Sequence, residues 1–387
     1  MARFHRLRVA AVDRLTEDSV ALTFAVPPGL REEYHHAPGQ HLALRRTEDG
    51  TEIRRTYSIC SPAPVPGGEG PRTLRVGVRL VAGGAFSTYA HKEIAAGDEL
   101  EVMTPSGRFT LDPAPGLYAA VVGGSGITPV LSIVTTLLER APGARFCLVR
   151  SDRTAASTMF LEEVADLKDR FPERFQLVTV LSREDQQTGL PSGRLDRERL
   201  ARLLPALLPV DEVAGWFLCG PFGLVQGAER ALRGLGVRRS RIHEEIFHVD
   251  DDRTAAAATA PSTTATAPFV IATAPSAAAT AATAGSPYSA HSSAPVRSTV
   301  TARLDGRSGS WPVREGESLL EAVLRNRPDA PYACKGGVCG TCRAYLVAGD
   351  VRMDRNFALE PEETEAGYVL ACQSRPATER VELDFDR

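Results

Sequence analysis

Four cysteines near the C-terminus have a spacing that suits metal-cluster chemistry. Cys334, Cys339 and Cys342 follow the pattern C-x4-C-x2-C, and Cys372 comes after a further 29 residues. Four thiolates in this arrangement hold a [2Fe–2S] cluster. Three glycines lie between the first and third cysteine, and they allow backbone N–H groups to turn towards the sulfurs. A structural zinc is the alternative, but zinc sites usually combine two short paired units and this segment has one.

The length, net charge and cysteine content of the chain exclude several classes of protein. The 387 residues are enough for two to three domains, and the net charge of −3 gives no footprint of a nucleic-acid or anionic-membrane partner. No run of 18 apolar residues predicts a membrane span. The other cysteines, Cys60, Cys147 and Cys219, lie in apolar or glycine-rich segments, so a secreted disulfide framework is not expected. The N-terminus lacks a signal-peptide pattern, and we expect a cytoplasmic protein.

The first part of the chain, residues 1–112, has the pattern of an antiparallel β-barrel. Short alternating apolar runs recur, for example at 20–26 and 74–81. Turn signals rich in proline and glycine separate these runs at regular intervals. Many short strands of even spacing are typical of a small closed barrel.

Residues 113–249 change to an alternation of strands and helices. Such an alternation with short connections predicts a parallel α/β sheet. The expected strands are 117–122, 145–150, 175–181, 215–219 and a short final segment, 241–247. The expected helices are one that ends at 140 and three more at 157–169, 196–204 and 222–235.

Residues 250–297 form a segment of low complexity. From 254 to 296 there is no Asp, Glu, Lys or Arg, and Ala, Thr, Ser and Pro dominate. Such a segment buries too little apolar surface to fold, and its prolines disfavour a buried Ala-rich helix. We expect a disordered tether whose ends lie roughly 35–40 Å apart as a flexible coil.

Residues 298–387 have the size and order of a small β-grasp domain. A hairpin is expected at 298–304 and 310–313, a helix at 318–326 and a last strand at 380–385, with the cysteine loop between the helix and that strand. The predicted fold class is therefore multidomain: an antiparallel barrel, a parallel α/β domain and a β-grasp domain.

Two motifs in the barrel segment suit a bound dinucleotide. Arg55-Thr56-Tyr57-Ser58 ends a predicted strand, although an Arg and a Tyr at such a place are ordinarily surface residues. Gly84 and the three residues after it form a Gly-x-x-Ser sequence at the start of a probable helix. Backbone N–H groups there are donors for a pyrophosphate.

Two further motifs lie at the ends of strands in the α/β segment. Residues 123–129, Gly-Gly-Ser-Gly-Ile-Thr-Pro, form a strand-to-helix turn suited to a phosphate. They are not the Rossmann fingerprint, because Pro129 stands where the third glycine would be. Cys219-Gly220-Pro221 follows a later strand, at the edge where open α/β sheets bind ligands, and a buried cysteine in a turn is its plainer interpretation.

In this order, these motifs resemble the ferredoxin–NADP reductase superfamily over residues 1–249. The resemblance implies that Arg55 holds the flavin diphosphate, Tyr57 stacks on the isoalloxazine and Ser58 hydrogen-bonds near N5. It implies that Gly84 and Ser87 bind the FAD pyrophosphate and that Thr128 and Cys219 line the nicotinamide. Ser58, Tyr57 and Cys219 would be the catalytic residues. The resemblance also places the following residues at the cofactors: Thr56, Val78, Arg79, Phe86, Thr88, Gly124, Gly126, Pro129, Gly220 and Pro221.

Ser182 and Arg183 decide the expected nucleotide. They look like the Ser-Arg pair that grips the 2′-phosphate of NADPH in this superfamily, and Arg153 is a second anion partner. A solvated arginine is the alternative, and Asp152 is a possible partner for the ribose hydroxyl of NADH. We favour NADPH because Arg183 offers a bidentate phosphate contact.

The C-terminal segment resembles the reductase component of bacterial phenylacetyl-CoA epoxidase at residues 332–343, 353–360 and 367–374. That resemblance implies electron flow from NADPH to FAD, to the [2Fe–2S] cluster and to a di-iron oxygenase partner. The long linker departs from the family and leaves open how tightly the modules dock. One alternative is a NADH-dependent reductase of a Rieske-type ring or steroid hydroxylase. Another is a non-catalytic redox sensor, which has no use for two nucleotide-binding motifs.

Overall fold

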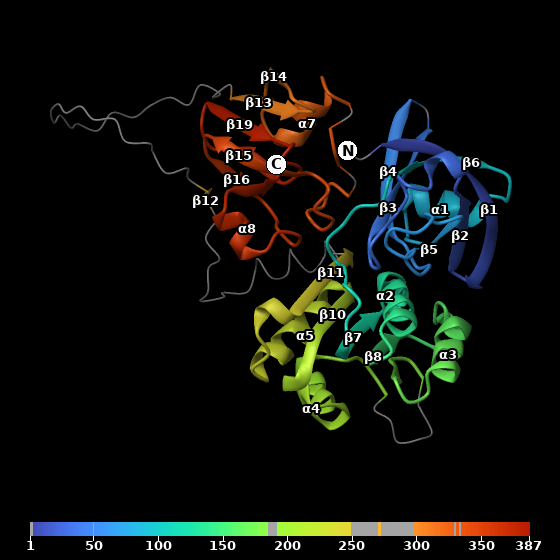
Figure 1. Ribbon diagram of the computed structural model, residues 1–387. Helices are drawn as coiled ribbons and strands as arrows, with labels where there is room; N and C mark the ends of the chain where they lie inside the picture. Colours follow the sequence, from blue (N-terminus) through green and yellow to red (C-terminus); the bar gives the residue numbers. More distant parts are fainter. Residues whose placement is uncertain are drawn as a thin grey trace, which may run out of the picture. The chain divides into compact units, whose positions relative to one another are not determined.

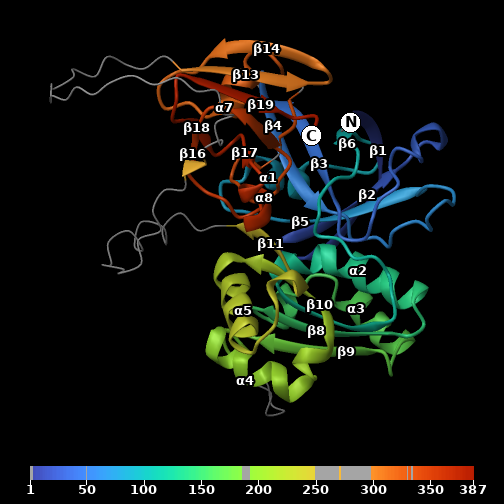
Figure 2. The ribbon, with the colours of Figure 1, turned by 60° about the vertical axis from the view of Figure 1, so that its left-hand side comes forward.

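The computed structural model describes residues 3–48, 50–184, 192–248, 270–271, 298–328, 330–332 and 334–387. The chain divides into two compact units, Met1–Thr259 and Ala260–Arg387. Figure 1 and Figure 2 show the elements of each unit. No helix in the described ranges is long and apolar enough to cross a membrane.

The N-terminal sheet is antiparallel and closes on itself, as predicted. Its strand order is β4-β3-β6-β1-β2-β5, and a bridge between Ile59 and Val76 joins the two edge strands. Alternate residues such as Leu22, Phe24 and Val76 point into a buried core. The elements are β1 (Phe4–Thr16), β2 (Ser19–Ala25), β3 (His41–Glu48), β4 (Thr51–Ser58), β5 (Thr73–Arg79), helix α1 (Ala85–Lys92) and β6 (Glu99–Met103).

The second sheet is wholly parallel, with the order β11-β10-β7-β8-β9. Its strands are β7 (Gly116–Gly123), β8 (Ala144–Asp152), β9 (Phe175–Leu181), β10 (Val213–Pro221) and β11 (Ile242–His248). Its helices are α2 (Ile127–Arg140), α3 (Leu161–Arg170), α4 (Arg197–Leu207) and α5 (Phe222–Gly234). Helices α2 and α3 cover one face, and α4 and α5 cover the other (Figure 1). From β7 the chain adds β8 and β9 on one side and then crosses to add β10 and β11 on the other. The direction of strand addition therefore reverses between β7 and β10, and such a switch point is where open α/β sheets bind ligands.

One helix begins later than the sequence predicts. The expected helix 157–169 is a 3-10 turn, Ala155–Ser157, followed by α3 from Leu161. Thr154 accepts a hydrogen bond from the Ser157 N–H and closes this turn as a capping box. Phe160 then takes a left-handed conformation, with φ of 54°, so the two helical pieces do not join.

The barrel and the parallel sheet share one apolar core. Helix α2 is buried over most of its length, and Cys60 and Phe109 of the barrel segment belong to its cluster. The Ala63 N–H also donates to Thr136 Oγ1 of α2 at 2.9 Å. Cys60 is buried, and its thiol donates to the Arg75 carbonyl at 3.2 Å, so packing is its role here.

The C-terminal unit is the predicted β-grasp domain. Its main sheet has the order β14-β13-β19-β15-β17, with β13 and β19 parallel and the other pairs antiparallel. Ser318 and Glu321 form a capping box at the start of its helix, α7. The elements are β13 (Thr299–Leu304), β14 (Arg307–Pro312), α7 (Leu319–Leu324), β15 (Arg343–Ala348), α8 (Pro361–Glu365), β17 (Tyr368–Leu370) and β19 (Arg380–Asp384).

A small second sheet corrects one prediction about the linker. Residues Val270–Ile271 form a strand, β12, that pairs antiparallel with β16 (Val351–Met353). On its other side β16 pairs with β18 (Ser374–Pro376). The prediction of a structureless segment is wrong at these two residues, because a β-branched pair supplies backbone partners to the edge of β16. The rest of the predicted linker lies outside the described residues.

Candidate active site

The two glycine-containing turns of the parallel sheet meet at its switch point. A Cβ on Gly126 would lie 2.2 Å from the Cys219 carbonyl oxygen, and one on Gly220 would lie 2.8 Å from the Gly123 carbonyl oxygen. Gly220 also has a φ of +139°, which only glycine adopts without strain. The backbones after β7 and β10 therefore approach more closely than any side chain allows.

Thr128 and Cys219 lie at this junction. Thr128 is buried, and its hydroxyl donates to the Ser125 carbonyl at 3.0 Å. Cys219 is fully buried, and burial raises the pKa of its thiol well above the usual value. The thiol is therefore protonated, and it is not a nucleophile in this state. Pro129 is buried in the first turn of α2.

The end of β4 supplies the residues predicted for the flavin. Ser58 is buried, and the Tyr57 and Phe86 rings lie with their centroids 5.5 Å apart. Burial raises the pKa of the Tyr57 phenol. Arg55 is exposed and donates to the Arg54 carbonyl at 2.7 Å, and Thr56, the next residue, is half-buried.

Helix α1 begins as predicted, with Gly84 as its N-cap. The Ser87 hydroxyl donates to the Gly84 carbonyl at 3.1 Å and accepts from the Val81 N–H at 3.1 Å. The hydroxyl therefore holds the turn, and the first N–H groups of the helix are the donors that remain for a pyrophosphate. Thr88 lies half-buried in the same first turn.

Arg79 joins the barrel to the nucleotide turn. A Cβ on Gly124 would lie 3.0 Å from Arg79 Nη1, and Arg79 Nε lies 3.3 Å from Asp18 Oδ1. Arg79 Nη2 donates to the Ser157 carbonyl. The neighbouring Val78 points into the barrel core. Arg79 thus faces the turn after β7, whereas the sequence placed it at the cofactors without saying which one.

The residues predicted for the adenosine end of the nucleotide lie together. The N–H groups of Ser182 and Arg183 donate to the Asp152 and Arg153 carbonyls, each at 2.9 Å. Arg153 and Arg183 are exposed at this edge. Asp152 is only 4% exposed, and its Oδ2 lies 2.8 Å from Arg150 Nε. Its carboxylate therefore has an internal partner. Of the two exposed arginines, Arg153 has its Nη2 3.6 Å from Asp18 Oδ2.

The sequence did not single out three further residues at the junction. Glu245 of β11 pairs in register with Cys219, and its Oε1 lies 4.0 Å from His41 Nδ1. The Ser106 hydroxyl lies 3.2 Å from His41 Nε2. Burial raises the pKa of Glu245 to about 8 and lowers that of His41 to about 4. The one sequence signal was the pair of acidic residues, Glu244 and Glu245, within the short final segment expected at 241–247.

The cysteine loop is shaped around its sulfurs. The Gly336 N–H donates to Cys334 Sγ at 3.3 Å, and Gln373 Nε2 lies 3.7 Å from Cys372 Sγ. Gln373 Nε2 also donates to the Lys335 carbonyl at 2.8 Å, which ties the loop to the segment of the fourth cysteine. Lys335 takes a left-handed φ of 53° that turns the loop.

The four thiols lie as two pairs. A hydrogen bond with Cys339 lowers the pKa of Cys334 to about 5, and one with Cys342 lowers the pKa of Cys372. No three His, Cys, Asp or Glu side chains in the described part of the chain are placed to hold a single metal ion. Four cysteines with this spacing are the ligand set of a [2Fe–2S] cluster.

Known proteins share this arrangement. The FAD-binding domain of oxidoreductases matches residues 6–111, the oxidoreductase NAD-binding domain matches 121–230, and the 2Fe-2S iron-sulfur cluster binding domain matches 302–377. A subunit of 1,2-phenylacetyl-CoA epoxidase from Escherichia coli is 40% identical over 390 residues, covering 100% of this chain and 99% of that protein. The chain belongs to the ferredoxin–NADP reductase superfamily.

Other members of the superfamily extend the comparison. The ferredoxin reductase component of a 3-ketosteroid-9-alpha-monooxygenase from Rhodococcus rhodochrous is 32% identical, covering 98% of this reductase and 96% of that protein. The solved structure of phthalate dioxygenase reductase matches with a TM-score of 0.55 and 23% identity over 99% of this chain and 98% of that one. The latter likeness confirms the predicted fold: an antiparallel FAD-type domain, a parallel NAD-type domain and a C-terminal cluster domain. The matched oxidoreductase domains and the Escherichia coli relative confirm the prediction of an oxidoreductase.

Proposed function

We propose that this reductase carries electrons from NADPH through FAD to its [2Fe–2S] cluster and on to an oxygenase. One chain of contacts carries the proposal. His41 pairs with Ser58 on β4, His41 lies 4.0 Å from Glu245, and Glu245 pairs with Cys219. The strand end assigned to the flavin therefore faces the strand end assigned to the nicotinamide. A flavin and a nicotinamide that stack on each other require these two strand ends to face one another.

The protein contributes binding and orientation. The half-buried Tyr57 ring, packed on Phe86, offers aromatic surface next to Ser58. The start of α1 offers N–H donors for the diphosphate, and Arg55 is exposed in β4. The family resemblance places the nicotinamide at Thr128 and the neutral Cys219, which are both buried where the two turns meet. FAD, when bound, accepts a hydride and releases electrons singly, which no side chain here does.

NADPH is the proposed nucleotide. Arg153 and Arg183 face outwards at the ends of β8 and β9, next to the Ser182 backbone, and suit a phosphate. Asp152, the candidate partner for a ribose hydroxyl, is buried against Arg150. The inward position of that carboxylate favours NADPH over NADH.

The proposed electron acceptor is the oxygenase of a phenylacetyl-CoA epoxidase, a di-iron enzyme. The 40% identity with the Escherichia coli epoxidase protein supports it, and the whole length of the chain matches. We further propose that the oxygenase, not this chain, binds the acyl-CoA, and that the complex is cytoplasmic. The second candidate acceptor is a steroid hydroxylase of the Rieske type, because the chain is 32% identical to a component of a 3-ketosteroid monooxygenase.

The two clients are separated by reconstitution. The purified reductase is mixed with each oxygenase under NADPH, and product formation is measured against NADPH consumption. The proposal expects coupled turnover with the epoxidase oxygenase and uncoupled NADPH consumption with the steroid hydroxylase. The reverse result would transfer the assignment to the second client.

A further inference from the structure

The small second sheet of the C-terminal unit includes a strand that the linker supplies. In this strand, β12, Val270 lies opposite Arg352 of β16 and Ile271 lies opposite Val351 (Figure 1). Both strands belong to the same compact unit, Ala260–Arg387. The sequence predicted a structureless tether at this place, so the contact has no role in the function proposed above.

The linker has one segment that suits a strand. Residues 269–271, Phe-Val-Ile, are the only run of consecutive large apolar residues between 254 and 296. Aromatic and β-branched residues favour strands. Pro268 and Pro275 flank the run, and they limit the length of a strand because proline has no N–H for a ladder. The sequence therefore confines strand pairing by the linker to a few residues.

One edge of β16 is available for this strand. The Asp354 N–H donates to the Gln373 carbonyl at 2.9 Å, on the side of β18. Backbone groups of successive residues point to opposite sides of an antiparallel strand, so Arg352 also faces β18 and Val351 faces β12. An unpaired strand edge is a template for another strand. The linker thus covers the edge that β18 leaves open.

This edge is close to the cysteine loop. Strand β16 belongs to the core of the domain, since Val351 is fully buried and the Leu370 N–H lies 3.5 Å from Met353 Sδ. Four residues after Met353, the Phe357 N–H donates to the carbonyl of Gly337 in the cysteine loop at 3.0 Å. A segment that pairs with β16 is therefore fixed to the part of the domain that supports this loop.

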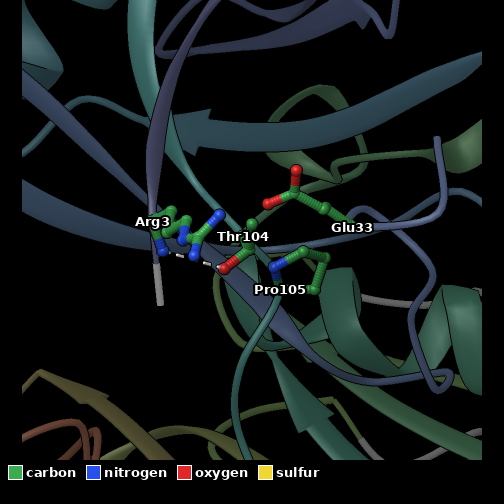
Figure 3. A pocket seen from close by; sticks show the side chains of 4 residues that line it. All are labelled: Arg3, Glu33, Thr104 and Pro105. Carbon is green, nitrogen blue, oxygen red and sulfur yellow. Dashed lines mark hydrogen bonds between the residues drawn. The ribbon is translucent and has the colours of Figure 1, made fainter. Parts of the chain in front are cut away.

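A pocket on the barrel offers no comparable place for a strand. Figure 3 shows its lining, Arg3, Glu33, Thr104 and Pro105, around a volume of about 390 Å³. The Arg3 N–H donates to Thr104 Oγ1 at 3.2 Å, and the Thr104 N–H donates to the Arg3 carbonyl at 2.9 Å. These backbone groups are already paired, so the pocket presents no strand edge to a linker segment.

We propose that the edge of β16 is a docking site for Val270–Ile271, and that this pairing sets the working length of the tether. Val270 is 22 residues from His248, the end of β11, whereas Thr299 at the start of β13 is 51 residues from it. Fully extended, the two spans reach at most about 75 and 175 Å. Residues 272–297 then begin and end on the same domain and add nothing to the reach. The consequence for electron transfer rests on the proposed function, in which the flavin reduces the cluster.

The pairing is tested by residue-resolved amide hydrogen exchange in the full-length protein with its flavin bound. Ile271→Pro removes the N–H opposite Val351, so the Val351 amide should exchange about tenfold faster or more. The Arg352 amide faces β18 and should not change. Ala279→Pro adds a proline elsewhere in the linker and is the matched control. Equal exchange of the Val351 amide in the wild type and Ile271→Pro would overturn the proposal.

The working length of the tether is tested by the position at which an insertion acts. About 20 Gly/Ser residues inserted after Ala260 lengthen the span before β12, and reduction of the cluster by the reduced flavin should slow about two- to threefold. The same insertion after Ala282 lies beyond β12 and should leave this rate unchanged. In Ile271→Pro the two insertions should have equal effects. Equal slowing by both insertions in the wild type would contradict the proposal.

The two readouts separate this proposal from the proposed function. Stopped-flow absorbance after mixing with NADPH gives the rate of cluster reduction. A protein whose flavin never passes electrons to the cluster would refute the proposed function. Amide exchange at Val351 needs no electron transfer, so it would still decide whether the linker docks on β16.

Discussion

Gly126 lies directly against the backbone of Cys219, and a Cβ on Gly126 would lie 2.2 Å from the Cys219 carbonyl oxygen. This contact closes the switch point of the parallel sheet, because it joins the turn after β7 to the end of β10. The same contact brings Thr128 and Cys219 to one surface. The nucleotide site proposed here depends on it.

Gly126→Ala should therefore weaken nucleotide binding. Its methyl group displaces the end of β10, and the Kd for NADPH is expected to rise about tenfold with a loss of about 1–3 kcal/mol in stability. Fluorescence titration and thermal unfolding measure the two effects. Gly29→Ala is the control, since nothing lies within 4 Å of a Cβ there. Unchanged affinity in Gly126→Ala would show that this contact does not shape the site.

Arg183→Ala tests the choice of nucleotide. If Arg183 binds the 2′-phosphate, the KM for NADPH should rise about tenfold or more and the KM for NADH should not change. Arg202→Ala, an exposed arginine of α4, is the matched control. Steady-state rates with an artificial acceptor give both constants. A parallel change in the two constants would contradict a phosphate contact.

Glu245 should leave a signature in the pH dependence of stability. Its pKa in the folded chain is about 8, above the usual 4.5, so the folded state keeps a proton that the unfolded state releases. Stability from this group is therefore present below about pH 4.5 and is lost as pH rises towards 8. Relative to Glu245→Gln, the wild type should lose roughly 2–4 kcal/mol between these values.

Denaturant titrations at several pH values measure this difference. His41 is present in both proteins, so its own titration cancels. Parallel curves of unfolding free energy against pH for the wild type and Glu245→Gln would rule out the raised pKa.

The linker is proposed to act as a tether that lets the cluster domain reach a partner while it stays near the flavin. Shortening residues 250–297 to a few residues should slow electron delivery to the oxygenase several-fold. Flavin bleaching by NADPH should be unaffected. A Gly/Ser replacement of the original length that keeps Val270 and Ile271 is the control and should restore delivery. If the short linker delivers electrons at the original rate, the tether has no such role.

The sequence was sufficient to predict the elements on which each short motif lies. The cysteine spacing, the turn at Gly126 and the strand ends at Ser58 and Cys219 all lie on the predicted elements. The spacing of the four cysteines identifies them as one ligand set, and the alternation of apolar residues predicts the strands. These features are local, so a sequence reports them.

The sequence could not predict contacts between distant segments. His41 and Glu245 lie on different sheets, and no local pattern brings them together. Arg79 reads as a barrel residue, but the fold turns it towards Gly124. Asp152 reads as a ligand for ribose, yet its partner Arg150 lies two residues earlier and inside the domain. Burial decides each of these roles, and burial depends on the whole fold.

The most direct test of the electron path is an anaerobic titration of the full-length protein with NADPH, followed by absorbance and EPR. We expect that the flavin absorbance bleaches and that a reduced [2Fe–2S] signal follows. In Cys372→Ser the flavin should still bleach, while the EPR signal and the bound iron are lost. NADH should act only at much higher concentration. A protein that binds zinc in place of iron, or a flavin that NADPH does not bleach, would contradict the account.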